Sequence, residues 1–515
     1  MRKVALPLLI LVAACAPASS QTVSAGPAPA TFDIALPAPE PVSAAEYAAR
    51  RQALLRTMGD GVLAVFGAPP PAADYLPFVQ LPDFRYLTGI MEPGAGYIAV
   101  KKGDRVEERL FVLPREPSRE VWEGARLGPD GARARTGISA ETNDRFFAVL
   151  DSLAGVHPTI HTTVVPPVRV SLGDEMTHAQ QVITRLKQKY PSLQVAAAQG
   201  MIRTQRGAKS AAELDRIRRA VHISALAHRE AMRSTMPGMN EFELRALMEF
   251  TFRRYGAEGP AYGSIVGSGP NSTTLHYQAS DRFMNDGEVL LIDAAASYGG
   301  YAADITRTFP VNGRFTTEQR NIYEVVLAAQ KAAAAQVRVG ATWSDLNEAA
   351  TTELRNGLAR LGLIDAPDAT YDCGTPSQVR KCPQLSLFYM HGLGHGVGLA
   401  VHDPDVSQSP AGFQHGSAVT IEPGLYIRAD AFDYLRDSPD NRAMIQRLRA
   451  AHTRYTNIGV RVEDVFILTA AGVERPSSPA PREIAEIEAL MAEPGLAQQG
   501  RMSDIVEWFR GNQGR

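Results

Sequence analysis

Two aspartates, Asp293 and Asp304, stand on either side of a predicted β-hairpin and could hold a cation between them. Residues 289–292 form a short apolar run typical of a buried strand, and Tyr298-Gly299-Gly300 supplies a turn before a second strand that begins near Thr306. A two-residue loop centred on Tyr298-Gly299 would place Asp293 directly opposite Asp304. Carboxylates opposed on one sheet face lie roughly 5 Å apart and repel each other. A shared proton or bound divalent metal would offset that repulsion, unless one aspartate only caps a turn.

Three histidines follow in a glycine-rich stretch, His391-Gly-Leu-Gly-His395-Gly-Val-Gly-Leu-Ala-Val-His402. Glycines at alternate positions argue against a regular helix, so we predict a loop that holds three imidazoles. An isolated histidine is usually an ordinary core or surface residue. Three of them on one glycine-rich loop favour a functional site instead.

Two glutamates fall on or beside predicted strands. Residues 419–422 read as a strand that ends on Glu422, because Pro423-Gly424 forces a turn. Residues 459–464 read as one strand, in which two-residue alternation puts Arg461 and Glu463 on the same face. Either strand alone could be a solvated edge. With the residues above, however, the chain offers four carboxylates and one imidazole, an oxygen-rich set suited to Mn²⁺ and similar ions: Asp293, Asp304, His395, Glu422 and Glu463.

Length and composition place few limits on function. A chain of 515 residues, 45% hydrophobic and 21% charged, has room for two or three ordinary globular domains. A net charge of −2 gives no electrostatic signature of nucleic-acid binding or of attraction to an anionic surface. We therefore expect no nucleic-acid partner.

The N-terminus predicts export. Arg2 and Lys3 precede an apolar stretch, residues 4–12, that is too short to span a membrane permanently. Val12-Ala13-Ala14-Cys15 resembles the lipobox of bacterial lipoproteins, which implies a lipid on Cys15; the alternative is an ordinary cleaved signal with an incidental cysteine. We expect a signal peptide over 1–14 and an Ala/Pro/Ser-rich, lipid-anchored linker over 15–41. The expected location is the periplasm at the outer membrane, with this lipid as the only membrane contact.

The other two cysteines, Cys373 and Cys382, lie nine residues apart in a stretch that contains Gly, Pro and Ser. In an oxidising compartment this spacing favours a disulfide, although two free thiols remain the alternative. Zinc is disfavoured because two cysteines do not make a four-ligand set.

Two capping-box sequences mark the main helices. Ser43-Ala-Ala-Glu46 predicts a helix to about residue 58, and Ser210-Ala-Ala-Glu213 predicts a long helix to about residue 235. A further helix is predicted over 240–255. An α/β pattern fills the first part, with strands at 62–66, 97–100 and 110–113 and helices near 141–154 and 175–190. We predict domains over 42–195 and 200–490, followed by a C-terminal tail over 491–515.

These motifs resemble the creatinase/aminopeptidase P/methionine aminopeptidase superfamily of pita-bread metallopeptidases, and within it aminopeptidase P. The resemblance covers about residues 43–490 and includes Asp83-Phe-Arg-Tyr-Leu-Thr-Gly, the segment 300–309, the His391 loop and Glu422-Pro-Gly-Leu-Tyr. It implies an α/β (α+β) protein, in which an N-terminal creatinase-like α/β domain precedes a C-terminal pita-bread metallopeptidase domain.

The resemblance also implies roles for single residues. The five candidate ligands would bind two divalent ions, with Asp304 and Glu463 bridging them, and a hydroxide between the ions would attack the scissile carbonyl. Mn²⁺ is the expected ion, with Co²⁺ or Zn²⁺ as substitutes. Glu422 would move a proton. By the same resemblance, His391, His402 and Arg461 have catalytic positions, and substrate would be contacted by His276, His391 and His402.

The resemblance implies peptide substrates with proline in the second position, from which an Xaa-Pro aminopeptidase removes the first residue. Prolidase, which uses the same ligands on dipeptides, remains an alternative. A non-catalytic binding protein or a metal-free amidinohydrolase would lack ligands that are present here. Segments 371–384 and 430–456 resemble insertions that could alter the cleft. Family members are often dimers or tetramers, so we expect a homodimer or homotetramer.

Overall fold

The structure is a computed structural model that describes residues 39–73, 75–164, 176–375, 377–406 and 411–498. The predicted signal peptide, Cys15, nearly all of the linker and the last part of the C-terminal tail lie outside these residues. Within them, no helix combines the length and the apolar composition that crossing a bilayer requires.

The N-terminal part is built on a mixed six-stranded sheet in the order β4-β3-β2-β1-β5-β6. Strand β2 runs antiparallel to both β1 and β3, and the pairs β1–β5, β5–β6 and β3–β4 are parallel. Alternate residues of β1 enter two separate cores, with Leu63 and Val65 on one face and Val62 and Ala64 on the other. The strands are β1 Gly61–Phe66, β2 Gly96–Lys102, β3 Arg105–Val112, β4 Ser139–Thr142, β5 Thr159–Thr162 and β6 Gln194–Ala197.

Helices cover both faces of this sheet: α1 Ala44–Thr57, α2 Pro82–Thr88, α3 Pro117–Glu123, α4 Gly128–Thr136, η1 Asn143–Arg145, α5 Phe146–Ala154, α6 His178–Lys189 and α7 Gln199–Gly207. The predicted capping box of α1 is only half formed. Ser43 accepts from the N–H of Glu46, but the Glu46 carboxylate bonds to Arg50 and Ser210 instead of to Ser43. The predicted helix 141–154 is also shorter than expected, because its first residues complete β4 and a 3₁₀ turn. The sheet itself extends to Ala197, past the predicted domain end near 195.

Among its described residues, the second part contains the long helix α8 and five further α-helices. The capping box of α8 is complete, because the side chains of Ser210 and Glu213 each accept from the other residue's N–H. The helix predicted over 240–255 is α9, for which Asn240 is the N-cap. The helices are α8 Ala211–Ser234, α9 Glu241–Arg254, η2 Gly269–Thr273, α10 Thr317–Ala334, α11 Trp343–Leu361, η3 Gln384–Leu387, α12 Pro439–Tyr455, α13 Ile484–Met491 and η4 Leu496–Gln498.

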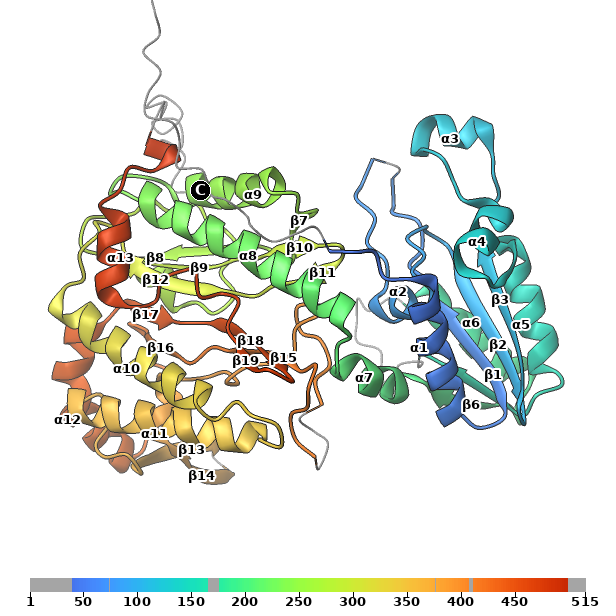
Figure 1. The fold of residues 1–515 in the computed structure, drawn as a ribbon. Coiled ribbons are helices and arrows are strands. Elements are labelled where there is room, and N and C mark those ends of the chain that lie inside the picture. The colour runs from blue at the N-terminus through green and yellow to red at the C-terminus, as the bar shows by residue number, and fades with distance from the viewer. Residues whose placement is uncertain (1–38, 74, 165–175, 376, 407–410, 499–515) are drawn as a thin grey trace, which may run out of the picture. The chain divides into compact units, whose positions relative to one another are not determined.

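Small sheets lie between these helices. Figure 1 shows α8 and α9 on one side of the strands and α10 and α11 on the other. The sheets have the orders β11-β10-β7, β12-β9-β8, β15-β18-β19, β16-β17 and β13-β14. Their strands are β7 Gly259–Pro260, β8 Ile265–Ser268, β9 Val289–Asp293, β10 Ala296–Tyr298, β11 Tyr301–Ala302, β12 Thr306–Pro310, β13 Thr370–Thr375, β14 Gln378–Pro383, β15 Ala418–Ile421, β16 Gly424–Ile427, β17 Ile458–Arg461, β18 Asp464–Thr469 and β19 Gly472–Glu474.

The two segments predicted as insertions contact each other. Segment 371–384 forms most of the β13–β14 hairpin, and segment 430–456 contains α12. The Asn441 side chain accepts from the N–H of Asp372 (2.9 Å) and donates to its carbonyl (2.9 Å). Cys373 and Cys382 form a disulfide across the hairpin, with their Cα atoms 5.8 Å apart.

We predict that peptide mapping under non-reducing conditions, on protein prepared from an oxidising compartment, will recover a Cys373–Cys382 cross-linked peptide. The two cysteines lie on paired strands within disulfide distance, and an oxidising compartment preserves such a bond. The same digest after reduction and alkylation serves as the control. Quantitative alkylation of both thiols without prior reduction would contradict the prediction.

Candidate metal centre

Asp293 and Asp304 approach each other through a hairpin whose register differs from the predicted one. Asp293 pairs with Thr306 across β9 and β12, not with Asp304. The turn lies one residue later than predicted, because Gly299 and Gly300 both take positive φ (57° and 76°), as the favoured two-residue turn requires. The partner of Asp293 therefore moves by two residues. A shift of two keeps every side chain on its face, so both aspartates still point to the same site.

A tyrosine that the sequence analysis did not single out joins these two carboxylates. The Tyr262 hydroxyl lies 2.6 Å from Asp293 Oδ1 and 2.5 Å from Asp304 Oδ1. A hydroxyl has one proton, so it donates to one carboxylate at a time. Burial and the two aspartates hold the Tyr262 pKa well above its usual value, which keeps the hydroxyl protonated. Its local sequence, Ala-Tyr-Gly-Ser, carries no sign of this role.

His395 faces the same carboxylates from the glycine-rich loop, which is irregular as predicted. The loop runs beside β15, where the Thr420 N–H donates to the His395 carbonyl (2.8 Å). A Cβ on Gly394 would lie 2.2 Å from the Thr420 carbonyl oxygen, so this close approach needs glycine. His395 Nδ1 lies 3.0 Å from the Gly396 carbonyl and is therefore the protonated nitrogen of the neutral ring. Nε2 is left facing Asp304 Oδ2 and Glu422 Oε1, each 3.4 Å away.

Glu463 completes the cluster from a break between two strands. The predicted single strand over 459–464 is wrong, because β17 ends at Arg461 and β18 begins at Asp464. The break leaves the Glu463 main chain available to β12: Arg307 Nη1 donates to the Glu463 carbonyl (2.5 Å), and the Glu463 N–H donates to the Thr306 carbonyl (3.1 Å). The Glu463 side chain thus turns inward, where Oε2 accepts from Thr306 Oγ1 (2.7 Å).

A fully buried ion pair fixes this break. Arg307 Nη2 lies 2.6 Å from Asp464 Oδ1, and neither side chain is exposed to solvent. Burial alone would raise the Asp464 pKa, but Arg307, Arg475 and Arg482 lower it to about 2. Asp464 therefore stays ionised and holds the strand end beside Glu463. Removing one member of such a pair leaves the other charge buried and alone, which is strongly destabilising.

One buried atom of the cluster has no partner in the structure. Glu463 is 1% exposed, and its Oε1 forms no hydrogen bond. Ligand atoms of Asp304, His395 and Glu463 all lie within 4.8 Å of one another. Buried carboxylate oxygens are normally satisfied. The free oxygen, the oxygen-rich donors and their convergence fit a divalent cation, and Asp293 and Glu422 adjoin the same three residues.

The charge balance of the site supports the same conclusion. Burial raises the pKa of Glu422 to about 7, that of Asp293 above its usual value, and that of Glu463 well above it. Burial alone would lower the His395 pKa, but Asp304 and Glu422 raise it to about 9. Arg461, whose Nη2 lies 2.5 Å from Asp293 Oδ2, supplies one permanent positive charge. The charges of Arg461 and of a protonated His395 offset the charges of only two of the four carboxylates. The four ionised carboxylates therefore need further positive charge, such as a bound metal ion, to be stable together.

Arg461, His391 and Tyr426 form a hydrogen-bonded chain at the edge of the cluster. His391 Nδ1 donates to the Gly392 carbonyl (2.7 Å), so its Nε2 accepts from the Tyr426 hydroxyl (2.8 Å). The Tyr426 oxygen in turn accepts from Arg461 Nη1 (2.8 Å). Burial and the nearby Arg461 charge lower the His391 pKa to about 4, so this imidazole is neutral at physiological pH. Tyr426 was not predicted, because nothing in Gly-Leu-Tyr-Ile signals its two partners.

The other two predicted histidines lie around the same site. The His402 ring is 4.2 Å from that of His395 between centroids. Burial and the charge of His395 lower the His402 pKa. His276 is exposed and lies close enough to His391 and His402 for its charge to lower the pKa of both. The structure therefore brings all nine predicted metal, catalytic and substrate residues into one neighbourhood: His276, Asp293, Asp304, His391, His395, His402, Glu422, Arg461 and Glu463.

Comparison with known proteins identifies the family. A model of metallopeptidase family M24 matches residues 215–470, and a model of the aminopeptidase P N-terminal domain matches residues 47–161. Xaa-Pro aminopeptidase from Escherichia coli is 33% identical over 464 residues, which cover 87% of this chain and 98% of the relative. The chain belongs to metallopeptidase family M24. Human Xaa-Pro aminopeptidase 3 is 31% identical over 81% of this chain.

Solved structures give the same assignment. A variant of E. coli aminopeptidase P in complex with substrate superposes with a TM-score of 0.73 at 32% identity, covering 88% of this chain and 99% of that one. Proline aminopeptidase P II from Yersinia pestis has a TM-score of 0.72 at 34% identity. These matches confirm the predicted fold, an N-terminal aminopeptidase P domain followed by a pita-bread metallopeptidase domain, and they show that the protein is a metal-dependent peptidase.

Proposed function

We propose that this peptidase removes the N-terminal residue from peptides that carry proline in the second position. The observation that carries the proposal is the convergence of Asp293, Asp304, His395, Glu422 and Glu463 on one buried site in which Glu463 Oε1 has no partner. The relatives whose whole length this chain spans are named Xaa-Pro aminopeptidase. Because all five ligands are present, a non-catalytic binding protein is disfavoured.

The five ligands would hold two divalent ions, and we propose Mn²⁺ as the ion used. Carboxylate oxygens with a single imidazole suit Mn²⁺, and Co²⁺ or Zn²⁺ can occupy similar donors. A Zn-substituted form of E. coli aminopeptidase P is among the similar structures. When bound, the ions polarise the scissile carbonyl and lower the pKa of water, which supplies a nucleophile at neutral pH.

The chain's own residues would position the peptide and move protons. Glu422, with a pKa of about 7, would accept a proton and pass it to the departing amine nitrogen. Neutral His391 and His402, with His276 at the exposed edge, would hydrogen-bond the peptide backbone. Arg461 would hold Asp293 in place through its 2.5 Å ion pair and hold His391 through Tyr426.

We predict that Xaa-Pro-Xaa tripeptides are cleaved with higher kcat/KM than the matching Xaa-Pro dipeptides. The imidazoles around the site can hydrogen-bond a carbonyl beyond proline, and that carbonyl belongs to an amide only in longer peptides. The measurement compares kcat/KM for both lengths at several first residues with metal-loaded protein. Tripeptides with alanine replacing proline control for specificity. A kcat/KM for dipeptides at or above that for tripeptides would assign the protein as a prolidase instead.

We also propose that the protein is exported and lipid-anchored through Cys15, and we predict that Cys15→Ser moves it out of the membrane fraction or blocks its processing. The support is the Val12-Ala13-Ala14-Cys15 sequence after a short apolar segment. Fractionation of cells that express either form, followed by mass spectrometry of the N-terminus, measures this. A Cys373→Ser variant controls for the loss of a cysteine. Unchanged membrane attachment of Cys15→Ser would show that Cys15 is not the anchor.

A further inference from the structure

A small cavity of about 230 Å³ lies where three helices from separate parts of the sequence, α2, α4 and α8, approach the β10–β11 turn. An arginine reaches it from each helix: Arg85 from α2, Arg135 from α4 and Arg216 from α8. Among the residues that the structure describes, no Asp or Glu lines this cavity. Three positively charged side chains and no described acidic side chain therefore line the cavity.

The two arginines nearest the turn bond only to main-chain carbonyls in the described part of the chain. Arg85 Nη2 donates to the Gly299 carbonyl (2.5 Å). Arg216 Nη1 and Nη2 donate to the carbonyls of Ala212 and Glu40, each at 2.6 Å. Arg216 is only 8% exposed. Buried charged side chains are usually paired with an opposite charge, and carbonyl dipoles do not supply one.

Nearby carboxylates are committed to other groups. Glu213 pairs with Arg50 (3.2 Å) and accepts from the Tyr301 hydroxyl (3.1 Å). Glu258 accepts from the Gly300 N–H (2.9 Å) on the other side of the turn. Glu92 accepts from the Leu127 N–H (2.5 Å), and burial raises its pKa although the charges of Arg126 and Arg135 oppose that rise. Among the described residues, none of these three carboxylates forms an ion pair with Arg85, Arg135 or Arg216.

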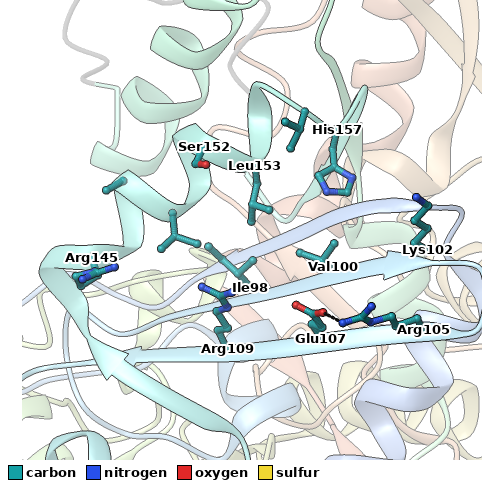
Figure 2. Close-up of a pocket in the computed structure, with 13 residues that line it drawn as sticks. Ile98, Val100, Lys102, Arg105, Glu107, Arg109, Arg145, Ser152, Leu153 and His157 are labelled. Carbon is teal, nitrogen blue, oxygen red and sulfur yellow. Dashed lines mark hydrogen bonds and ion pairs between the residues drawn. The ribbon is translucent and has the colours of Figure 1, made fainter.

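A larger groove of about 660 Å³ on the N-terminal sheet makes a useful contrast (Figure 2). It also carries arginines, but each of them has a carboxylate. Arg105 lies 2.6 Å from Glu107, as the dashed line in Figure 2 shows, and Arg109 and Arg145 lie 3.5 and 3.6 Å from Glu141. Each arginine of the groove thus has an ion-pair partner, with Arg109 and Arg145 sharing Glu141, whereas the arginines of the small cavity form no ion pair among the described residues.

We propose that the small cavity binds a free tetrahedral oxyanion of the inorganic phosphate or sulfate class. The guanidinium group presents paired N–H donors that match such an anion, and three groups from different elements can surround it. At about 230 Å³ the cavity is smaller than the roughly 300–1,000 Å³ of sites for drug-sized ligands, which favours a small ion. The anion would join α2 and α4 to α8 and to the turn of the hairpin that carries Asp293 and Asp304.

Equilibrium dialysis of the metal-loaded, full-length protein against radiolabelled inorganic sulfate tests this proposal. Arg135→Gln is the informative variant, because Arg135 lies at an exposed position of α4. Arg133→Gln is the matched control: it removes the same charge from the same helix, outside the cavity, where Arg133 pairs with Asp130 (2.8 Å). Any binding of sulfate at the metal centre is common to all three proteins, so only their difference reports on the cavity.

We expect saturable sulfate binding that Arg135→Gln weakens about tenfold or more, the scale of losing one charge-assisted hydrogen bond. Arg133→Gln should bind as the unchanged protein does. Arg85→Gln, checked for folding by circular dichroism, should weaken binding as well. The proposal would be overturned if no saturable sulfate binding depended on Arg135. It would also be overturned if Arg133→Gln and Arg135→Gln weakened binding equally, because equal weakening would report only the change in net charge.

Discussion

Stripping divalent metal from the protein with a chelator is expected to abolish peptide hydrolysis, and adding Mn²⁺ or Co²⁺ is expected to restore it. The physical reason is the excess negative charge of the site, where four carboxylates face one arginine and one histidine. Thermal unfolding provides a second readout. A metal that binds only the folded state at 100 times its Kd adds about 2.7 kcal/mol to the free energy of unfolding. Chelation should therefore lower Tm as well as activity.

Glu463→Gln separates metal binding from general damage to the protein. Glutamine keeps the size of the side chain but removes the charge of the buried oxygen that has no partner. Loss of a ligand should weaken metal affinity at least about tenfold, the lower end of what even outer-shell changes cause. Glu318→Gln, which neutralises a half-buried glutamate paired with Arg454 and outside the cluster, is the control. Full activity after exhaustive chelation would remove the metal from the mechanism, and unchanged metal affinity in Glu463→Gln would remove Glu463 from the ligand set.

The ligand set could be predicted from sequence because its signals are local. Asp293 ends an apolar strand, Glu422 precedes Pro-Gly, and the glycines around His395 exclude a helix. The predicted register of the hairpin that carries Asp293 and Asp304 was wrong, but the prediction that both carboxylates face one site was still correct. Pairing repeats every two residues, so a partner displaced from Asp304 to Thr306 leaves both carboxylates on the same face.

Residues whose partners lie far away in sequence could not be predicted in this way. Tyr262 reaches Asp293 across 31 positions, and Tyr426 reaches His391 across 35. The half-formed cap at Ser43 has the same origin, because Glu46 bonds to Ser210 from 164 positions away. The break before Glu463 is set by Arg307, which is itself fixed by its buried pair with Asp464. In each case the structure is decided by a contact with a residue far away in the sequence, and the local sequence does not show that contact.

Replacing Glu422 by alanine or glutamine is expected to lower kcat by roughly 10²-fold or more, the scale for loss of a proton-transfer group. Burial raises the Glu422 pKa to about 7 in the protein without metal, which favours proton uptake by this carboxyl. Its Oε1 lies 3.4 Å from His395 Nε2, among the other ligands. Steady-state kinetics on an Xaa-Pro-Xaa peptide, with each variant saturated in Mn²⁺, measures the effect.

Because Glu422 is also a candidate ligand, the two roles have to be separated in the same experiment. Metal content measured in parallel shows how much of the loss comes from an empty site, and thermal unfolding shows whether the fold persists. Glu422→Asp keeps the charge but shortens the side chain, so it should bind metal better than Glu422→Gln while its proton transfer is still impaired. A fully metallated Glu422→Gln variant with unchanged kcat would show that Glu422 only binds metal. The proton would then have to move through another group. The first candidate is neutral His391, whose Nδ1 lies 4.0 Å from Glu422 Oε2.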